Sequence, residues 1–245
     1  MPEITALLFD CDNTLVLSEE LAFEACAELI NKICAERDLT ITFTGETLIQ
    51  EFVGQNFRGM LNSLQERYNI KISPEDLETY VTAEEDAVIA KLKAALRPCP
   101  GVDDELEKLA ASNKYLLSVV SSSALRRVRA SIEKVGQDKY FKGDVVFSAA
   151  TSLPVPTSKP DPAVYNFAME KLGKTPQECV AIEDSKSGTL SGTRAGMKVV
   201  GYVGPYPDDK KVEMEKVLRD AGAVIIMQDW SEFPACLAKI EAGSV

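Results

Sequence analysis

The chain contains no histidine, and this absence excludes several kinds of active site. Catalytic triads that depend on a histidine base are impossible, and so are zinc sites with histidine ligands. Acid–base chemistry is therefore left mainly to carboxylates, and the sequence has 38 acidic side chains against 27 basic ones. Because the net charge is −11, we expect neither nucleic acid nor an anionic membrane as a partner.

The sequence also lacks paired cysteines and long apolar segments. Its six cysteines show no C-x-x-C spacing and several lie in apolar stretches, so we interpret them as reduced core thiols of a cytoplasmic protein. No apolar run approaches the length of a membrane span. We expect no signal sequence, because an apolar strand begins almost at Met1.

What the sequence does contain is enough apolar surface for a sizeable core, since 45% of its 245 residues are hydrophobic. That length suits one large domain or two modest ones. Apolar helix faces serve cores and interfaces equally well, so a monomer and a small homo-oligomer both remain open.

The spacing of apolar residues divides the chain into two kinds of segment. Between Leu17 and Leu96 apolar residues recur every three or four positions, which predicts helices throughout. Outside that stretch apolar strands alternate with amphipathic helices, which predicts βα units and a mostly parallel sheet. The helices expected in the insert span 18–37, 45–51, 56–68 and 74–95. The strands expected elsewhere span 4–9, 115–120, 144–148, 179–183, 198–203 and 223–227, with helices at 124–134, 163–172, 208–221 and 231–241.

The expected fold class is therefore α/β, with a parallel-sheet core that is interrupted by an all-helical insert. Residues 1–16 and 97–245 would form the core, and residues 17–96 would form the insert. Pro98 and Pro100 stiffen the return of the chain to the core.

Two carboxylates one residue apart follow the first apolar strand. Asp10 and Asp12 stand where the run from Ile4 to Phe9 ends, and at this spacing in extended chain both side chains point to one side. Such a pair is costly to desolvate unless a cation or hydrogen-bond donors compensate it. Mg²⁺ meets that need, because it prefers oxygen ligands and commonly accompanies phosphate. A surface turn rich in Asp and Asn is the alternative reading.

Three later segments place polar groups in comparable positions. Ser121 and Ser122 lie between an apolar strand and a helix, which suits phosphate binding. Lys159 lies in a proline-stiffened turn before another helix, where it can neutralise a phosphate. Glu183 and Asp184 end a further strand and can bind a metal. Taken alone, each segment has a simpler explanation: the serines and the acidic pair could cap helices, and the lysine could be an ordinary exposed one. In open α/β sheets, however, ligands bind at the carboxyl ends of the strands, where all these groups would meet.

Together these segments resemble the four motifs of the haloacid dehalogenase superfamily, in the class that has a helical cap after the first motif. The matching segments are D-x-D-x-T at 10–14, the serine at 121, K-P-D-P at 159–162 and E-D-S-x-x-G at 183–188. The resemblance implies a Rossmann-like core in which residues 17–96 form the cap domain.

The resemblance also implies a role for each motif residue. Asp10 would be the nucleophile that forms an aspartyl-phosphate, and Asp12 would act as general acid and then as general base. The implied ligands of Mg²⁺ are Asp10, the backbone carbonyl of Asp12, Asp184 and, through water, Glu183. The implied phosphate-binding groups are Ser121, Lys159 and a backbone N–H of Ser122.

Within the insert, a loop near residues 52–58 faces the active site in capped members of the superfamily. Gln55, Asn56 and Arg58 offer hydrogen-bond donors to substrate hydroxyls or to a second anion, and Arg58 is the preferred candidate. A helix–helix connector with solvated polar groups is the alternative reading.

The sequence departs from the family pattern at a few positions. Many relatives have Gly and Asp where this chain has Asn13 and Leu17; the first change is mild, because Asn tolerates left-handed backbone geometry. The related sugar-phosphate mutases have a His at the position of Ala22, which favours a hydrolase here. Asp12, in contrast, follows the pattern of the phosphatases. Dehalogenases and phosphonate-cleaving members lack an Asp at this position, so a substrate with a carbon–oxygen–phosphorus ester is favoured.

We therefore expect a Mg²⁺-dependent phosphatase that acts on a small phosphorylated metabolite, namely a sugar, sugar alcohol or sugar acid phosphate. A β-phosphoglucomutase-like sugar phosphate mutase is the first alternative. A catalytically silent phosphate-binding protein is the second, and the presence of every motif residue argues against it.

Overall fold

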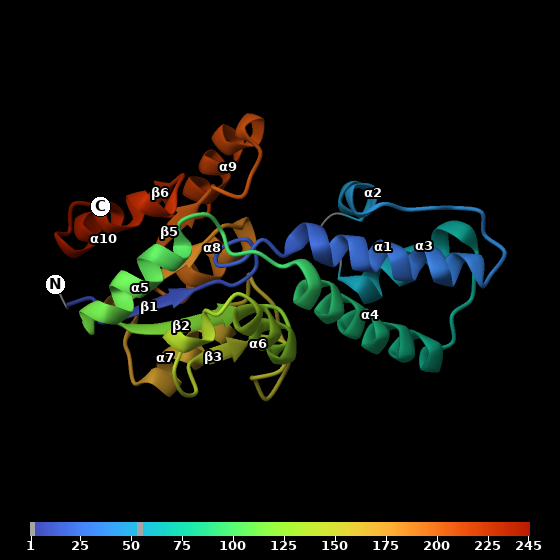
Figure 1. Cartoon of the computed structure of the whole chain (residues 1–245), viewed down its shortest axis with the longest axis horizontal. Helices are drawn as coiled ribbons and strands as arrows, with labels where there is room; N and C mark the ends of the chain where they lie inside the picture. The colour runs from blue at the N-terminus through green and yellow to red at the C-terminus, as the bar shows by residue number, and fades with distance from the viewer. Residues whose placement is uncertain (1–2, 53–55) are drawn as a thin grey trace. The chain divides into compact units, whose positions relative to one another are not determined.

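The computed structural model describes residues 3–52 and 56–245, and the chain divides into two compact units. One unit contains the chain up to Leu17 and from Arg97 to Val245, and the other contains Ser18–Leu96 (Figure 1). The first unit ends at Leu17, one residue later than expected, because the backbone of this segment pairs with the returning chain. The Leu17 N–H donates to the Arg97 carbonyl, and Val16 forms a bridge with Pro98.

The first unit is built on a parallel sheet of six strands in the order β3-β2-β1-β4-β5-β6. This is the Rossmann-like order, in which the direction of winding reverses between β1 and β4. The central strand β1 is flanked on both sides, since Ala6 is in register with Leu116 of β2 and with Cys179 of β4. The strands are β1 (Ala6–Phe9), β2 (Leu116–Ser121), β3 (Val146–Ser148), β4 (Cys179–Glu183), β5 (Lys198–Tyr202) and β6 (Ile225–Met227).

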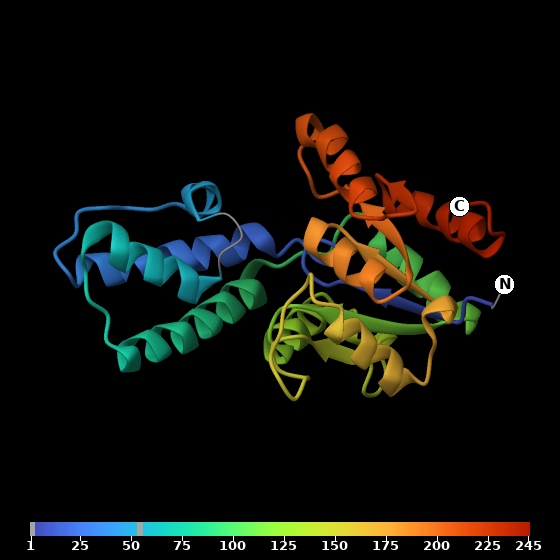
Figure 2. The ribbon, with the colours of Figure 1, turned by 180° about the vertical axis from the view of Figure 1, so that it is seen from behind.

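Helices cover both faces of this sheet, so β1 is buried along its whole length. Successive side chains of a strand point to opposite faces. Leu8 packs into a cluster with Tyr165 and Met169, whereas Phe9 contacts Trp230 and Phe233 on the other face. In Figure 1 helix α5 lies in front of the sheet, and in the reverse view of Figure 2 helices α7 and α8 lie in front. The helices of this unit are α5 (Val102–Ser112), α6 (Leu125–Lys134), α7 (Ala163–Leu172), α8 (Lys186–Arg194), α9 (Asp208–Asp220) and α10 (Phe233–Glu241).

Helix α8 can approach β4 and β5 closely because it contains two buried glycines. A Cβ atom added at Gly192 would come within 2.9 Å of a Val199 side-chain carbon, and one added at Gly188 would overlap the carboxylate of Glu183. The glycines that follow the E-D-S motif therefore determine how near the helix lies to the end of β4.

The described residues of the second unit form helices and no strands, as expected. Its helices begin where the sequence supplies caps: Thr44 and Thr47 form a capping box, Asn56 caps the next helix, and Ser73 accepts a hydrogen bond from the Asp76 N–H ahead of the last. Helix α1 buries an apolar stripe and packs against both α2 and α4. The four helices are α1 (Glu19–Ala35), α2 (Gly45–Glu51), α3 (Phe57–Tyr68) and α4 (Pro74–Ala95).

The sequence predicted each strand and each of these four helices to within a few residues of its bounds. Two helices of the core, α5 and α8, were not assigned individually; α8 was obscured because Gly188 and Gly192 have low helix propensity. The C-terminal helix expected at 231–241 starts as a 3₁₀ turn, Trp230–Glu232, before α10.

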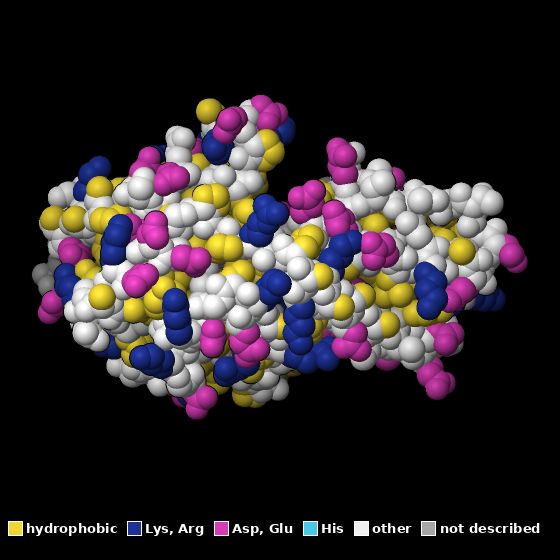
Figure 3. Space-filling view, in the orientation of Figure 1, with side chains coloured by type: hydrophobic (Ala, Val, Ile, Leu, Met, Phe, Trp, Pro, Cys, Tyr) yellow, Lys and Arg dark blue, Asp and Glu magenta, His cyan; other side chains and the backbone are white. Residues whose placement is uncertain are grey.

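None of the helices within residues 3–52 and 56–245 is both long and apolar enough to cross a bilayer. On the face shown in Figure 3, acidic and basic side chains are interspersed, with small apolar areas between them. The acidic side chains therefore do not form one continuous negative patch on this face.

Candidate active site

The four predicted motifs meet at the carboxyl ends of the central strands. Asp10 directly follows β1, and its N–H donates to the Ile182 carbonyl of β4 at 3.0 Å. Glu183 is the last residue of β4, and Ser121 is the last residue of β2. The site therefore lies at the point where the strand order reverses, which is where ligands bind in sheets of this type.

A tight turn after β1 orients the first motif. Asn13 has a φ of 58°, in the left-handed region that Asn tolerates. The turn is closed by the Cys11 carbonyl, which accepts the N–H groups of the three residues after Asn13 at 3.0–3.4 Å. The Thr14 hydroxyl donates to Asp184 Oδ1 at 3.4 Å and so joins the first motif to the last.

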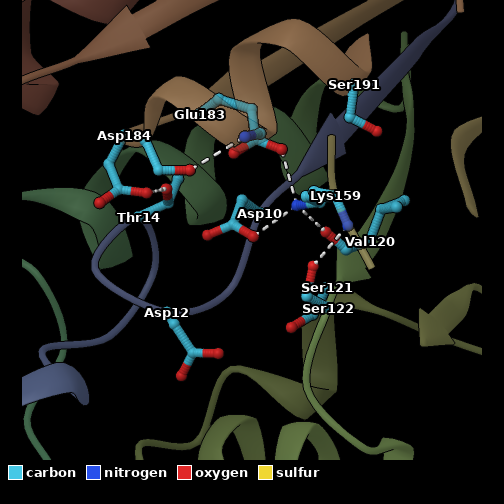
Figure 4. Close-up of polar contacts among 12 residues, drawn as sticks. Asp10, Asp12, Thr14, Val120, Ser121, Ser122, Lys159, Glu183, Asp184 and Ser191 are labelled. Carbon is cyan, nitrogen blue, oxygen red and sulfur yellow. Dashed lines mark hydrogen bonds and ion pairs between the residues drawn. The ribbon is translucent and has the colours of Figure 1, made fainter. Parts of the chain in front are cut away.

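Lys159 lies at the centre of the site (Figure 4). Its ammonium contacts Asp10 Oδ1 and Glu183 Oε1, each at 2.6 Å, and donates to the Val120 carbonyl at 2.8 Å. The side chain is 3% exposed. Burial lowers the pKa of the Lys159 ammonium, but the adjacent Asp10 and Glu183 carboxylates outweigh burial and hold it above its ordinary value. The lysine is therefore charged and already placed among anions.

Glu183 is fully buried, and its surroundings limit its movement. Oε1 accepts from the Tyr165 hydroxyl of α7 as well as from Lys159, while Oε2 faces Gly188 and has no hydrogen-bond partner among the described residues. Burial raises the pKa of the Glu183 carboxyl to about 7 despite the lowering effect of Lys159. The Tyr165 ring also lies 5.2 Å from the Lys159 ammonium. One tyrosine thus supports both partners of this ion pair.

Three carboxylates of the site could share one cation. Asp10, Glu183 and Asp184 are all buried, and each offers an oxygen atom such that the three atoms lie within 4.8 Å of one another. Burial also raises the pKa of Asp10, with Lys159 opposing and Asp12 adding to that effect. Because Lys159 brings one positive charge to three carboxylates, a hard divalent cation with oxygen ligands fits the charge and the chemistry of this cluster. The unsatisfied Oε2 of Glu183 is a further buried acceptor at the same place.

The raised pKa of Glu183 predicts how stability depends on pH in the absence of metal. Between the ordinary pKa of 4.5 and the folded value of about 7 the native state binds more protons than the unfolded state, so the free energy of unfolding falls as pH rises through this window. A Glu183→Gln variant cannot titrate there. We expect its melting temperature, relative to that of the unmodified chain, to rise from pH 5 to pH 8 in metal-free buffer. If the difference in melting temperature between the two chains does not change from pH 5 to pH 8, the raised pKa of Glu183 is contradicted.

The serines at the end of β2 make hydrogen bonds within the protein. Ser121 Oγ accepts from the Ser123 N–H at 3.0 Å and is 1% exposed as a residue. Ser122 Oγ accepts from the Lys159 N–H at 3.1 Å. The Ser122 hydroxyl therefore positions the lysine loop, and its backbone N–H remains the expected phosphate donor.

Asp12 is held by two residues that the sequence did not single out. The Ser123 hydroxyl donates to Asp12 Oδ2 at 2.7 Å, and the Arg127 guanidinium contacts Oδ1 at 3.2 Å. In Figure 4 the Asp12 carboxylate points away from the Lys159 ammonium. A signal for Arg127 was present in the sequence, because a basic residue in the first turn of a helix opposes the helix dipole and is costly there without an anion nearby.

The residues predicted in the helical unit make contacts within that unit. Asn56 Oδ1 accepts from the Gly59 N–H at 2.9 Å as the cap of α3. The Arg58 guanidinium binds both carboxylate oxygens of Glu78 on α4, at 2.5 and 2.7 Å. Gln55 lies outside the described residues. These contacts give Asn56 and Arg58 structural roles in the helical unit, so their predicted role in selecting the leaving group stays a prediction.

The sequence of the chain matches a known family. The family described as haloacid dehalogenase-like hydrolase matches residues 7–202, a range that contains all four motifs. The chain belongs to this family. The predicted superfamily, the α/β fold with a Rossmann-like core, and the predicted class of enzyme, a hydrolase, are thereby confirmed.

Similar proteins include named phosphatases. A phosphorylated carbohydrates phosphatase from Thermotoga maritima is 30% identical over 91% of this chain and 94% of its own length. A 6-phosphogluconate phosphatase from Escherichia coli K12 is 26% identical over 89% of this chain and 90% of its own length. Among solved structures, a hydrolase of this family from Deinococcus radiodurans with bound phosphate and sodium is 26% identical, with a TM-score of 0.71 and coverage of 97% and 96% of the two chains.

Proposed function

We propose that this hydrolase is a Mg²⁺-dependent phosphatase that cleaves a phosphate monoester of a small metabolite (a sugar, sugar alcohol or sugar acid phosphate) through an aspartyl-phosphate on Asp10. The observation that carries the proposal is the position of Lys159, whose buried ammonium lies 2.6 Å from both Asp10 and Glu183. A cation placed beside a carboxylate in this way also suits the oxygens of a transferring phosphoryl group. The names of the Thermotoga and Escherichia relatives support the choice of substrate class.

In the first step, an Asp10 carboxylate oxygen attacks phosphorus and the bond from phosphorus to the ester oxygen breaks. Asp12 donates a proton to the departing alkoxide, which leaves as an alcohol. Lys159, Ser121 and the backbone N–H of Ser122 stabilise the charge on the phosphoryl oxygens. Phosphoryl transfer depends mainly on such positioning and charge stabilisation.

In the second step, Asp12 accepts a proton from water as that water attacks phosphorus. The bond between Asp10 and phosphorus breaks, which restores the Asp10 carboxylate and yields inorganic phosphate. Asp12 therefore returns to its protonated form, ready for another turnover. Both steps balance without any redox partner.

The residues that would hold Mg²⁺ are Asp10, the backbone carbonyl of Asp12, Asp184 and, through water, Glu183. An indirect role suits Glu183, since one of its oxygens is already bound by Lys159 and Tyr165. When bound, the ion supplies charge that offsets repulsion between the anionic phosphate and the anionic nucleophile.

The helical unit, Ser18–Leu96, is proposed to act as the cap domain that selects the leaving group and excludes water during turnover. A cytoplasmic location is proposed as well. It is supported by the six buried cysteines, all within the described residues, which form no disulfide, as is typical of a reducing compartment.

The test is a screen of phosphorylated metabolites for released phosphate, with Mg²⁺ and with EDTA. We expect at least one sugar, sugar alcohol or sugar acid phosphate to release inorganic phosphate only when Mg²⁺ is present. Chromatography of the products separates the alternative, because a mutase accumulates an isomeric phosphate ester instead. Phosphate release that EDTA does not affect, or an isomeric ester as sole product, would refute the proposal.

A further inference from the structure

The two side chains that contact Asp12, Ser123 and Arg127, form a small binding site for a carboxylate. Each oxygen of Asp12 has its own donor, Ser123 Oγ at 2.7 Å for Oδ2 and Arg127 at 3.2 Å for Oδ1. A hydroxyl and a guanidinium that address the two oxygens of one carboxylate are matched to that planar group. The side chains of Arg127 and Asp12 are 19% and 27% exposed, so a dissolved anion can reach them.

These contacts conflict with the role of Asp12 in the proposed reaction. To give a proton to the leaving oxygen, Asp12 must turn at least one of its oxygens toward the substrate. That movement breaks a contact with Ser123 or Arg127, which costs free energy unless another anion takes the place of Asp12. The cost disappears if the substrate brings a carboxylate of its own to the same two donors.

We propose that Ser123 and Arg127 bind a carboxylate of the substrate in place of Asp12, so that the preferred substrate is a sugar acid phosphate and its binding frees Asp12 for proton transfer. This inference rests on the proposed phosphatase function. It assigns the hydroxyl and guanidinium to substrate selection, which the motif residues do not explain.

The experiment uses two six-carbon esters that differ at one end. 6-Phosphogluconate carries a carboxylate at C1, whereas sorbitol 6-phosphate carries a hydroxymethyl group there. We expect the unmodified enzyme to have the higher kcat/KM for 6-phosphogluconate. In Arg127→Met that value falls by about 10- to 100-fold, the range for loss of a hydrogen bond to a charged group, mainly through KM. Hydrolysis of sorbitol 6-phosphate should rise instead, because Asp12 no longer gives up a contact with Arg127 when it turns toward the substrate.

Two further variants separate recognition from structure. Arg129→Met removes the same charge two residues along α6, about 200° around the helix, and should leave both substrates unaffected. Ser123→Ala should repeat the pattern of Arg127→Met with a smaller loss. Thermal melting of each variant shows whether the fold is retained, and a purely structural role for Arg127 would lower kcat/KM for both esters together.

The outcomes also separate this inference from the proposed function. If both esters are hydrolysed with equal kcat/KM, or if Arg127→Met affects them equally, the carboxylate site is wrong while the phosphatase function stands. If the unmodified enzyme releases phosphate from no phosphate monoester, both are wrong.

Discussion

Replacing Asp10 with Asn should reduce phosphate release by at least about 10³-fold, the scale expected when a nucleophile is removed. The amide keeps the shape of the carboxylate but cannot form the acyl phosphate at a useful rate. It also removes one charge from a cluster of three buried carboxylates, so we expect the variant to stay folded, with a melting temperature no lower than that of the unmodified chain.

The measurement is the rate of phosphate release under saturating Mg²⁺, with Asp144→Asn as the control. Asp144→Asn makes the same chemical change in the same unit, at an exposed position outside the four motifs. Turnover by Asp10→Asn at a rate close to that of the control would remove Asp10 as nucleophile and, with it, the proposed mechanism.

Replacing Lys159 with Met should damage both stability and turnover. The side chain is buried, and its ammonium contacts two carboxylates and a carbonyl. Breaking a buried ion pair by removing one partner costs about 3–5 kcal/mol, because the remaining charge is left uncompensated. For a chain of this length that loss corresponds to a fall in melting temperature of about 6–20 °C.

The effect of Lys159→Met should depend on pH and on metal. Burial already raises the pKa of Asp10 and Glu183, and without the ammonium both carboxyls become easier to protonate. The loss of melting temperature should therefore be larger at pH 8 than at pH 5, and saturating Mg²⁺ should recover part of it by binding the native state. Lys142→Met, at an exposed position of the same unit outside the four motifs, is the matched control. An unchanged melting temperature at pH 8 would contradict the structural role of Lys159.

The sequence predicted the framework of the site because its signals are local. A run of apolar residues followed by acids or hydroxyls marks a strand end, and the parallel arrangement brings such ends together. For this reason the sequence alone predicts that Asp10, Ser121, Lys159 and Glu183 lie at one edge of the sheet.

The side chains that support the site were harder to predict because they depend on helix orientation. Tyr165 reaches Glu183 only because α7 presents that face to the sheet, and in sequence it reads as one more apolar position. Arg58 was proposed from its residue type and from its place in the segment that faces the active site in capped relatives. Its contact with Glu78, twenty positions away on another helix, could not be predicted in this way. Such pairings follow from packing between helices, which the spacing of apolar residues does not encode.

The burial of every cysteine has a practical consequence for following motion in this protein. All six cysteines lie within the described residues, and each is buried and outside any disulfide. Burial raises the pKa of several thiols, that of Cys179 to about 12, so a thiol reagent reacts slowly until the chain opens. Cys26 and Cys34 report on the helical unit, and the other four report on the sheet unit. Alkylation followed by mass spectrometry can thus time the opening of each unit separately, with no label introduced into the natural sequence.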